Sequence, residues 1–286
     1  MSNEWIVEES TELLKYLNSV MSGRSRNSVK AILGRGQVFV NGEVTTQFND
    51  PLVSGDRVQI RTRVATDEHK MKGVTILHED DELIVVEKEA GLLSIATENE
   101  KLMTAYRQVN DYVKSVQAKN QIFVVHRLDR DTSGIMMFAK TKEIQQTLQN
   151  TWQETVFERT YIALVEGTVK QDGTITSWLK ESKAFVVHSS PTENDGQKAI
   201  THYKVMKSNR AMSLLQVNLE TGRKNQIRVH MQDIEHPVVG DKKYGAQTNP
   251  IRRLGLHAHA LAFTHPKTGE SLRFESKIPT TFMRTF

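Results

Sequence analysis

Hydrophobic positions near the start of the chain first follow a helical spacing and then alternate. Two apolar clusters have the helical spacing: Leu13, Leu14 and Leu17, then Val29, Ile32 and Leu33. They predict two helices within residues 11–35, and Ser25 or Asn27 between them is a suitable cap for the second. The segment QVFVNGEV follows, where Asn-Gly between β-branched residues predicts a tight hairpin.

Residues 55–64, GDRVQIRTRV, alternate as a strand with one apolar and one basic face. Val58, Ile60, Thr62 and Val64 share one side, and Arg57, Gln59, Arg61 and Arg63 share the other. Together with the two helices they predict a compact α+β module over residues 11–63. We expect residues 1–10 to be an N-terminal tail, and the charged, aperiodic residues 64–74 to be a linker.

A second and larger domain is predicted over residues 75–286. It opens with a hairpin, TILHEDDELIVVEK, whose turn lies at Asp80-Asp81, and continues with an amphipathic helix, KLMTAYRQVNDYVKSVQ. Another helix, KEIQQTLQNTWQE, precedes a series of predicted strands: ERTYIALVEGTV, KAITHYKVM, SLLQVNLETG and GLHAHALAFTHPKTGESLRF. The order of elements is mixed, which favours an α+β fold over a doubly wound one.

Composition excludes several classes of protein. The 286 residues include no cysteine, which rules out disulfides, thiolate metal sites and cysteine nucleophiles. The first ten residues lack the basic start and apolar run of a secretory signal. No apolar run approaches the roughly 18 residues of a membrane helix. We therefore expect a cytoplasmic protein without membrane association.

Basic residues are concentrated in the first module. The net charge of +4 alone says little about partners. From Leu13 to Gly42, however, the chain has no acidic residue and carries five basic ones: Lys15, Arg24, Arg26, Lys30 and Arg35. A single exposed arginine is usually only solvated, but a block of this kind favours contact with RNA or DNA phosphates.

The segment HRLDRDTSG, residues 126–134, carries more charge than a turn needs. Asp131, beside Thr-Ser-Gly, is typical of a residue that caps a turn through the backbone. Asp129 has two interpretations from composition alone. It either caps the same turn, or it is a carboxylate that acts as nucleophile or base at a sugar carbon. In the second case a nearby arginine would be needed to keep a buried carboxylate ionised.

Two further segments contain candidate functional residues. In ERTYIALVEG, Tyr161 lies within an otherwise apolar strand. In ETGRKNQIRVHM, Gly222 permits a turn, and Ile227 and Met231 predict one face of a short helix. Arg228 would then lie on a neighbouring face near the start of that helix.

Other chemistries lack their motifs. His257 and His259 would share a strand face near His230 and His236, but no H-E-x-x-H or other dense ligand set exists. Hydrogen-bonded structural histidines are the better interpretation. Neither a Walker loop nor G-x-S-x-G is present. A glycoside hydrolase would need opposed carboxylates, for which Asp131 is a poor partner of Asp129. We expect neither a metal nor a cofactor.

The first module resembles the RNA-binding module named after a small-subunit ribosomal protein, the S-four type. The similarity covers residues 13–60: a leucine-bearing helix, Ser-Arg before a Val-Lys helix, G-x-V-x-VNG and a final GD-x-V-x-I. It implies that four basic residues face RNA: Arg24, Arg26, Lys30 and Arg35.

The second domain resembles the RluA/RluD family of RNA pseudouridine synthases. The similarity is carried by HRLD-x-x-TSG, ERTYIALVEG, GRKNQIRVHM, HPVVGDKKYG and LGLHAHALAFTHP, in that order. It implies a mixed, mostly antiparallel sheet, with Asp129 as catalytic carboxylate, Tyr161 against the target base and Arg228 paired with Asp129. It also implies that Arg127 fills the space that the flipped base leaves.

The resemblance predicts a cofactor-free isomerase that converts specific uridines in structured RNA to pseudouridine. Ribosomal RNA, of the large subunit in particular, is the favoured substrate, and we expect a monomer. Asp129 either attacks the sugar or removes a sugar proton. The alternative from another class is a non-catalytic RNA-binding or ribosome-assembly factor with the same fold. Three residues depart from the family pattern and bear on substrate choice: Glu89, Lys224 and Asn225.

Overall fold

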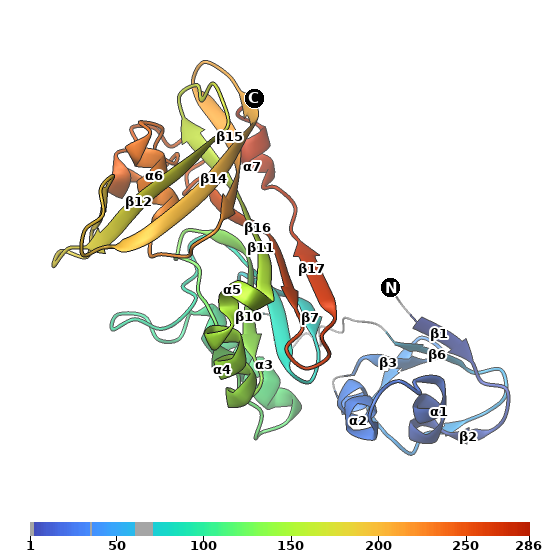
Figure 1. Ribbon diagram of the computed structural model, residues 1–286. Coiled ribbons are helices and arrows are strands. Elements are labelled where there is room, and N and C mark those ends of the chain that lie inside the picture. The colour runs from blue at the N-terminus through green and yellow to red at the C-terminus, as the bar shows by residue number, and fades with distance from the viewer. Residues whose placement is uncertain (1–2, 35, 61–70) are drawn as a thin grey trace.

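The structure is a computed structural model that describes residues 3–34, 36–60 and 71–286 (Figure 1). Its small N-terminal module contains two helices, α1 (Leu13–Val20) and α2 (Arg26–Gly34). A sheet of order β1-β6-β3-β4 packs with them. Its strands are β1 (Asn3–Ile6), β3 (Val38–Val40), β4 (Glu43–Thr45) and β6 (Arg57–Ile60). Two short strands, β2 (Thr11–Glu12) and β5 (Pro51–Leu52), pair separately.

The local predictions for this module are confirmed where the structure describes it. The leucine and valine clusters of α1 and α2 are buried together in one core with Val38, Leu52 and Val58. Ser25 Oγ accepts a hydrogen bond from the Ser28 N–H at 3.2 Å and so caps α2. Asn41 and Gly42 turn the β3–β4 hairpin with φ of 52° and 88°, as a two-residue turn of this kind requires.

The N-terminal residues differ from the prediction of a tail. Residues 3–6 form β1, which pairs antiparallel with β6, and Gln59 Nε2 donates to Glu4 Oε2 at 2.7 Å. No apolar alternation marks this strand, because Asn3 and Glu4 are polar and the apolar Ile6 is exposed beside Trp5. The basic end of the predicted strand beyond Ile60 and most of the predicted linker lie outside the described residues.

The larger domain is built on a long, mostly antiparallel sheet of order β13-β12-β14-β15-β11-β16-β10-β8-β7. Two strands lie off this path: β17 pairs with β16, and β9 pairs with β10. The strands are β7 (Val74–Glu79), β8 (Leu83–Lys88), β9 (Phe123–Val124), β10 (Ser133–Ala139), β11 (Val156–Glu166), β12 (Gly173–Glu181), β13 (Val187–Ser190), β14 (Gln197–Ser208), β15 (Met212–Leu219), β16 (Leu256–Thr264) and β17 (Ser271–Glu275). The mixed α+β fold class with a mostly antiparallel sheet is confirmed.

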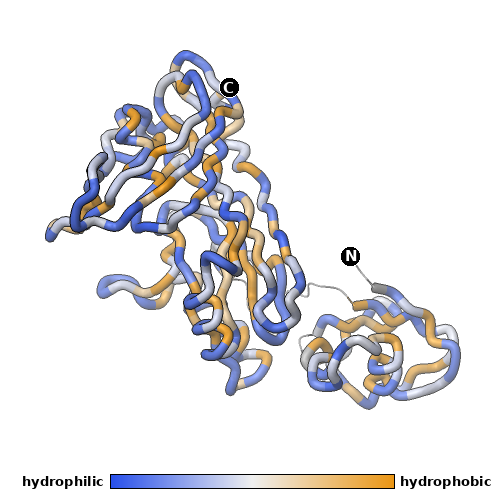
Figure 2. Tube along the Cα trace, viewed as in Figure 1, coloured by the Kyte–Doolittle hydropathy of each residue, from blue (hydrophilic) through white to orange (hydrophobic). Residues whose placement is uncertain are grey.

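Helices cover both faces of the β7–β8–β10 part of the sheet. On β8, Ile84 and Val86 face α3 (Ala105–Val116), whereas Leu83 and Val85 face α4 (Lys142–Asn150) and the short α5 (Trp152–Thr155). The strands are apolar on both sides for this reason, and Figure 2 shows apolar residues gathered along these central strands.

The β11–β15 part of the sheet is covered in the same way. The short helix α6 (Gln226–Asp233) packs on Ala163, Val165, Leu215 and Val217 through Ile227 and Met231. On the opposite face, Phe282 of α7 (Thr280–Met283) packs on Ile162, Leu164 and Leu214. A 3-10 turn, η2 (Lys242–Tyr244), follows α6. Tyr161 packs against both the α3 cluster and the α6 cluster, so it lies where the two parts of the domain meet.

The two parts of the sheet join through β10 and β16, the pair that runs parallel. Gly134 lies at this junction with φ of +116°, and a Cβ there would approach the carbonyl oxygen of Ala258 to 2.1 Å. The sequence places Gly134 in the turn before the strand, but in the structure it lies within β10, where glycine permits the close approach of β16. In the described residues, no helix is long and apolar enough to cross a membrane.

Candidate active site

The loop that carries Asp129 is held from both sides by hydrogen bonds. Ser94 Oγ donates to the Leu128 carbonyl at 2.7 Å and lies 3.1 Å from the Leu128 N–H. The carbonyl oxygen of Arg130 accepts from the Gly91 N–H at 2.9 Å and from Lys88 Nζ at 3.0 Å. Because the residues before and after Asp129 are anchored in this way, the backbone position of Asp129 is fixed.

Lys88 is the buried cation behind this loop. Its ammonium group donates to three backbone carbonyls, those of Glu89 at 2.9 Å, Leu92 at 2.7 Å and Arg130 at 3.0 Å. Burial, together with the positive charge of Arg253 and against the attraction of Asp131 and Asp129, lowers the pKa of Lys88 to about 8. The ammonium group thus joins the segment after β8 to the Asp129 loop.

His126, the first residue of HRLDRDTSG, is also structural. Its Nε2 accepts a hydrogen bond from the Met137 N–H at 3.1 Å, and its ring lies 4.9 Å from that of Trp152. Burial, and to a smaller extent the charge of Arg159, lowers the pKa of His126 to about 4. The imidazole is therefore neutral at pH 7 and fastens the start of the loop to β10.

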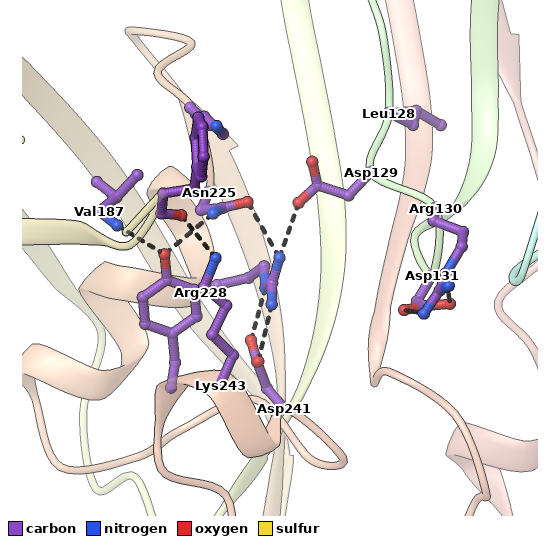
Figure 3. Close-up of polar contacts among 12 residues, drawn as sticks. Leu128, Asp129, Arg130, Asp131, Val187, Asn225, Arg228, Asp241 and Lys243 are labelled. Atoms are coloured by element: carbon purple, nitrogen blue, oxygen red, sulfur yellow. Dashed lines mark hydrogen bonds and ion pairs between the residues drawn. The ribbon is translucent and has the colours of Figure 1, made fainter. Parts of the chain in front are cut away.

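Arg228 on α6 faces Asp129, and Figure 3 shows its guanidinium between two carboxylates. Its Nη1 donates to Asp129 Oδ2 at 3.1 Å. Its Nε and Nη2 donate to the buried carboxylate of Asp241 at 2.6 and 2.9 Å. Burial lowers the pKa of Arg228, but Asp241 and Asp129 outweigh burial and raise it. The predicted partnership of Arg228 with Asp129 is thus present in the geometry.

Asn225 and Tyr244 complete the surroundings of Arg228. Asn225 precedes α6 in the left-handed conformation, with φ of 55°, and its Oδ1 accepts from Arg228 Nη1 at 3.0 Å. Its Nδ2 donates to the Tyr244 hydroxyl oxygen at 3.0 Å, which also accepts from the Val187 N–H at 3.2 Å. The guanidinium lies 4.9 Å from the centre of the Tyr244 ring. These contacts leave the guanidinium little freedom to turn away from Asp129.

An irregularity in the sheet sets the direction of the Tyr161 side chain. The pairing of β11 with β16 shifts between Thr160 and Tyr161, a bulge of the type that re-aims side chains beside active sites. Burial raises the pKa of Tyr161 to about 12, the charge of Arg159 opposes the rise, and that of Asp129 adds to it. The side chain is therefore a neutral phenol at physiological pH.

These residues line one open cavity of about 340 Å³. Arg127 and Asp129 of one loop border it together with Tyr161 and Arg228, which lie far from that loop in the sequence. Leu256 and the segment 222–227 complete the lining. The volume is within the range of pockets that bind small molecules or single bases. Arg127 itself is exposed at the rim.

The basic residues expected to face RNA lie in the other module. Arg24, Arg26 and Lys30 are exposed at the turn before α2 and along its first part. Arg26 and Lys30 are one helical turn apart and so share a face. Arg35 lies outside the described residues.

Among the other candidates, the structure agrees with the expectation for two histidines and differs from it for Asp131. His257 and His230 are structural as expected: His257 bonds Ser133 and Ser276, and His230 bonds Ser177 and Thr201. Among the described residues, no group of three or more His, Asp or Glu side chains is placed to hold a metal. Asp131 differs from the expectation of a backbone cap, because its carboxylate accepts instead from the exposed Arg130 guanidinium at 3.2 and 3.3 Å.

Sequence inspection missed four residues of the site: Lys88, Ser94, Asp241 and Tyr244. Asp241 and Tyr244 belong to HPVVGDKKYG, a segment that resembles the synthase family but whose individual residues have no role predicted from the sequence.

Comparison with known protein families agrees with both modules. The S4 domain matches residues 11–66, and the RNA pseudouridylate synthase family matches residues 82–233. A basic RNA-binding module joined to a domain with an ion-paired carboxylate in an open cavity defines an RNA-modifying enzyme.

Relatives cover most of the chain. A ribosomal large subunit pseudouridine synthase D of Neisseria meningitidis is 32% identical over 279 residues, which cover 92% of this chain and 74% of the relative. The uncharacterized RNA pseudouridine synthase YlyB of Bacillus subtilis is 32% identical over 95% of this chain and 92% of the relative. Human RNA pseudouridylate synthase domain containing 4 shares the fold, with a TM-score of 0.60 at 22% identity over 73% of this chain and 90% of that structure. The chain belongs to the RNA pseudouridylate synthase family, whose members isomerise uridine in RNA to pseudouridine.

Proposed function

We propose that this enzyme makes pseudouridine in ribosomal RNA of the large subunit, with Asp129 as the catalytic carboxylate. The observation that supports this role best is the pair of Asp129 Oδ2 and Arg228 Nη1, 3.1 Å apart at the edge of the cavity that Tyr161 also borders. The substrate is proposed because several relatives are named ribosomal large subunit pseudouridine synthase D.

The reaction needs no second substrate. The bond between the ribose C1′ and uracil N1 breaks, the base turns within the cavity, and C5 forms a new bond to C1′. N1 gains one proton and C5 loses one, so atoms and charge balance without an oxidant or reductant. Asp129 takes part either by attacking C1′ or by removing a proton from the neighbouring sugar carbon. Either route requires the carboxylate to lie close to the sugar.

Arg228 has the role of a positioning residue. Its bonds to Asp241 hold the guanidinium, and a charge-assisted hydrogen bond then directs one oxygen of Asp129. Removing the cation would leave two carboxylates without their counter-charge.

Tyr161 is proposed to lie against the uracil ring. As a neutral phenol it offers a flat face and a hydrogen-bond donor rather than a base. Arg127, exposed at the rim, is proposed to occupy the gap that the flipped uridine leaves in the RNA. Flipping costs a few kcal/mol in a duplex and least in a loop, so the target uridine is expected in an unpaired segment.

The N-terminal module is proposed to bind the same RNA through Arg24, Arg26, Lys30 and Arg35. Its exposed cations at α2 suit phosphates, and the tether raises the local concentration of the catalytic domain at the RNA. We propose the division 11–63 for this module, 64–74 for the linker and 75–286 for the catalytic domain.

We further propose that the enzyme acts as a monomer in the cytoplasm. Asp129, Tyr161 and Arg228 already border a common cavity within a single chain, which supports a monomer as the active species. Sedimentation of the purified protein at micromolar concentration is expected to give a single species of 32.5 kDa. A stable dimer would contradict the monomer without affecting the chemistry.

The deciding experiment is a pseudouridine map of total RNA from cells with and without the gene. Deletion is expected to remove pseudouridine at specific sites of large-subunit ribosomal RNA. Wild type restores those sites and Asp129→Asn does not, although the variant folds and binds RNA. Asp131→Asn is the matched control, because that carboxylate lies on the same loop but forms its hydrogen bonds with exposed Arg130 and not with Arg228, and it is expected to restore the sites.

Product formation by Asp129→Asn would overturn the catalytic role of Asp129. Sites that persist in the deletion strain, together with loss of pseudouridine from another RNA, would overturn the choice of ribosomal RNA. An unchanged map in all RNAs would favour the non-catalytic RNA-binding factor.

A further inference from the structure

A second hollow of about 710 Å³ adjoins the active-site cavity. The two share Asp129, Lys224, Asn225 and Arg228, so the second opens directly onto the catalytic carboxylate. It extends from there along η2 and residues 249–254 to the loop between β12 and β13. A chain that enters the active site can therefore continue along this hollow.

The hollow is strongly basic. Besides Arg228, six cationic residues line it: Arg130, Lys224, Lys242, Lys243, Arg252 and Arg253. Three acidic residues also line it, and each accepts from an arginine: Asp129 and Asp241 from Arg228, and Asp131 from Arg130. Lys224 forms an ion pair with Glu181, and Arg253 donates hydrogen bonds to Ser133 Oγ and to two backbone carbonyls. The remaining positive charge suits a polyanion.

One aromatic residue stands at the edge of this basic hollow. Phe185 is 71% exposed, whereas a phenylalanine is ordinarily buried. Its φ of 58° lies in the left-handed region, which bulky residues rarely adopt. Such backbone strain is tolerated mainly where the surrounding structure enforces it, often at functional sites.

The contacts of the loop enforce this conformation. The Phe185 N–H donates to the Ser182 carbonyl at 2.9 Å, and the Ser182 N–H donates to the Val186 carbonyl at 2.8 Å. Lys243 Nζ donates to the Phe185 carbonyl at 2.8 Å and ties the loop to η2. The loop therefore directs a large apolar ring outward from a fixed backbone.

Lys224 connects this ring with the active-site segment. Its Nζ lies 5.7 Å from the centre of the Phe185 ring, and the next residue, Asn225, contacts Arg228. The aromatic ring, the cation and the hollow thus form one continuous surface beside Asp129.

We propose that Phe185 is a stacking platform for a nucleobase next to the target uridine, in a single-stranded RNA segment that lies along the basic hollow. Lys242 and Arg252 contact the phosphates of that segment. This inference rests on the proposed function and specifies how the RNA beside the flipped uridine is held. Stacking on an aromatic ring accepts any base, since every base has a π-face, so the platform adds affinity without dictating the neighbouring sequence.

The test uses full-length enzyme and ribosomal RNA purified from cells that lack the gene. Pseudouridine formation is followed in single turnover over a range of enzyme concentrations, which separates half-saturation from maximal rate. Phe185→Ala and Phe185→Leu are expected to raise the half-saturating concentration about 10-fold with a maximal rate within about 3-fold of wild type. Phe185→Trp is expected to match or exceed wild-type affinity, because it keeps a ring.

Phe157→Ala is the matched control, since Phe157 is also exposed, at 59%, but does not border either hollow. It is expected to behave as wild type. Wild-type behaviour of Phe185→Ala would overturn the platform. So would full activity of Phe185→Leu, because that result would indicate an apolar contact without stacking.

Failure of the proposed function gives a different pattern. In that case wild type forms no pseudouridine on this RNA, and the platform is tested by binding of the same RNA alone. Weaker binding by Phe185→Ala and Phe185→Leu, with retention by Phe185→Trp, then supports the platform independently of ribosomal RNA as substrate. Equal binding by all variants overturns it.

Discussion

The two modules of this enzyme use charge in opposite ways. The N-terminal module has a purely aliphatic buried core and carries Arg24, Arg26 and Lys30 on its surface. The catalytic domain buries charged and titratable groups, including Lys88, Asp241, His230 and His257. Residues 1–60 contain no histidine at all, whereas each of the ten histidines follows them.

The difference reflects what each module has to achieve. Exposed cations attract phosphates from a distance, need no exact geometry and are weakened by salt. Buried ion pairs give little net stability, because desolvation cancels much of the attraction, but they hold their members in one arrangement. We therefore propose that surface charge in this chain provides affinity for RNA, and that buried charge orients the carboxylate of Asp129.

The largest effect is expected from breaking the buried ion pair. Arg228→Met removes the guanidinium from between Asp129 and Asp241, so the proposed catalytic carboxylate of Asp129 loses its orientation and its counter-charge. We expect the single-turnover rate of pseudouridine formation to fall about 1000-fold, or about 4 kcal/mol. RNA affinity, measured by filter binding, is expected to change less than about 3-fold.

Arg228→Lys tests whether positive charge alone is sufficient at this position. Lysine keeps the charge but cannot donate simultaneously to two carboxylates and Asn225 in the geometry of guanidinium. It is expected to recover less than a tenth of the wild-type rate. A fully active Arg228→Lys would indicate that charge alone is required. An Arg228→Met enzyme that loses affinity instead of rate would move Arg228 to RNA binding.

Much of the fold was predictable because local patterns and tertiary packing agree. The helices α1, α2, α3 and α4 carry apolar positions at helical spacing, and α2, α3 and α4 also begin at capping residues. The β3–β4 and β7–β8 hairpins carry turn residues that favour the observed elements. Thr104 and Thr141, for example, accept hydrogen bonds at the starts of α3 and α4. At β1 the pattern is absent, since its stability comes from pairing with the distant β6.

The core of the site was predictable only in part. Asp129, Tyr161 and Arg228 belong to distinctive motifs, and the family resemblance predicts that they share one site. In the structure all three border the same cavity. Asp241 and Lys88 were missed, because their contacts join residues 13 and 42 positions apart and no local spacing encodes them. The conformation of Asn225 is equally hidden, because a positive φ depends on how α6 is attached to β15.

Acid is expected to destabilise the catalytic domain selectively. Burial lowers the pKa of His230 to about 4, that of His126 to about 4 and that of His257 to about 3. In the unfolded chain each titrates near 6.5, so between pH 6.5 and 4 the unfolded state binds more protons and stability falls as pH falls. His230 alone contributes a loss of about 3 kcal/mol across this window.

The measurement is urea unfolding at pH 7 and pH 4.5, followed by hydrogen exchange of peptides from each module. The catalytic domain is expected to lose stability, while the N-terminal module has no histidine contribution to lose. His202→Asn is a suitable control, because His202 is exposed on β14, and the variant is expected to keep the wild-type pH dependence. An equal acid loss in both modules would contradict a role of the buried histidines.

Removing surface charge from the N-terminal module is expected to have a smaller effect, which is confined to RNA binding. Replacing Arg24, Arg26 and Lys30 together by glutamine is expected to weaken RNA affinity about 10-fold at physiological salt. The slope of log affinity against log salt is expected to fall by about 2, as for loss of three phosphate contacts to single-stranded RNA. The rate at saturating enzyme should stay at the wild-type value. An unchanged salt slope would refute RNA contact by this module.

The smallest effect is expected at Asn225, where conformation and side chain can be separated. Asn225→Gly keeps the left-handed backbone but removes the bonds to Arg228 and Tyr244. Because Asp241 still holds Arg228, we expect only about a 5-fold fall in single-turnover rate with little change in stability. Asn225→Ala removes the same bonds and adds about 1 kcal/mol of backbone strain, so its rate should match that of the glycine variant while its unfolding free energy falls further. Full activity of Asn225→Gly would show that Asp241 alone positions the guanidinium, and the buried network would then be smaller than its contacts suggest.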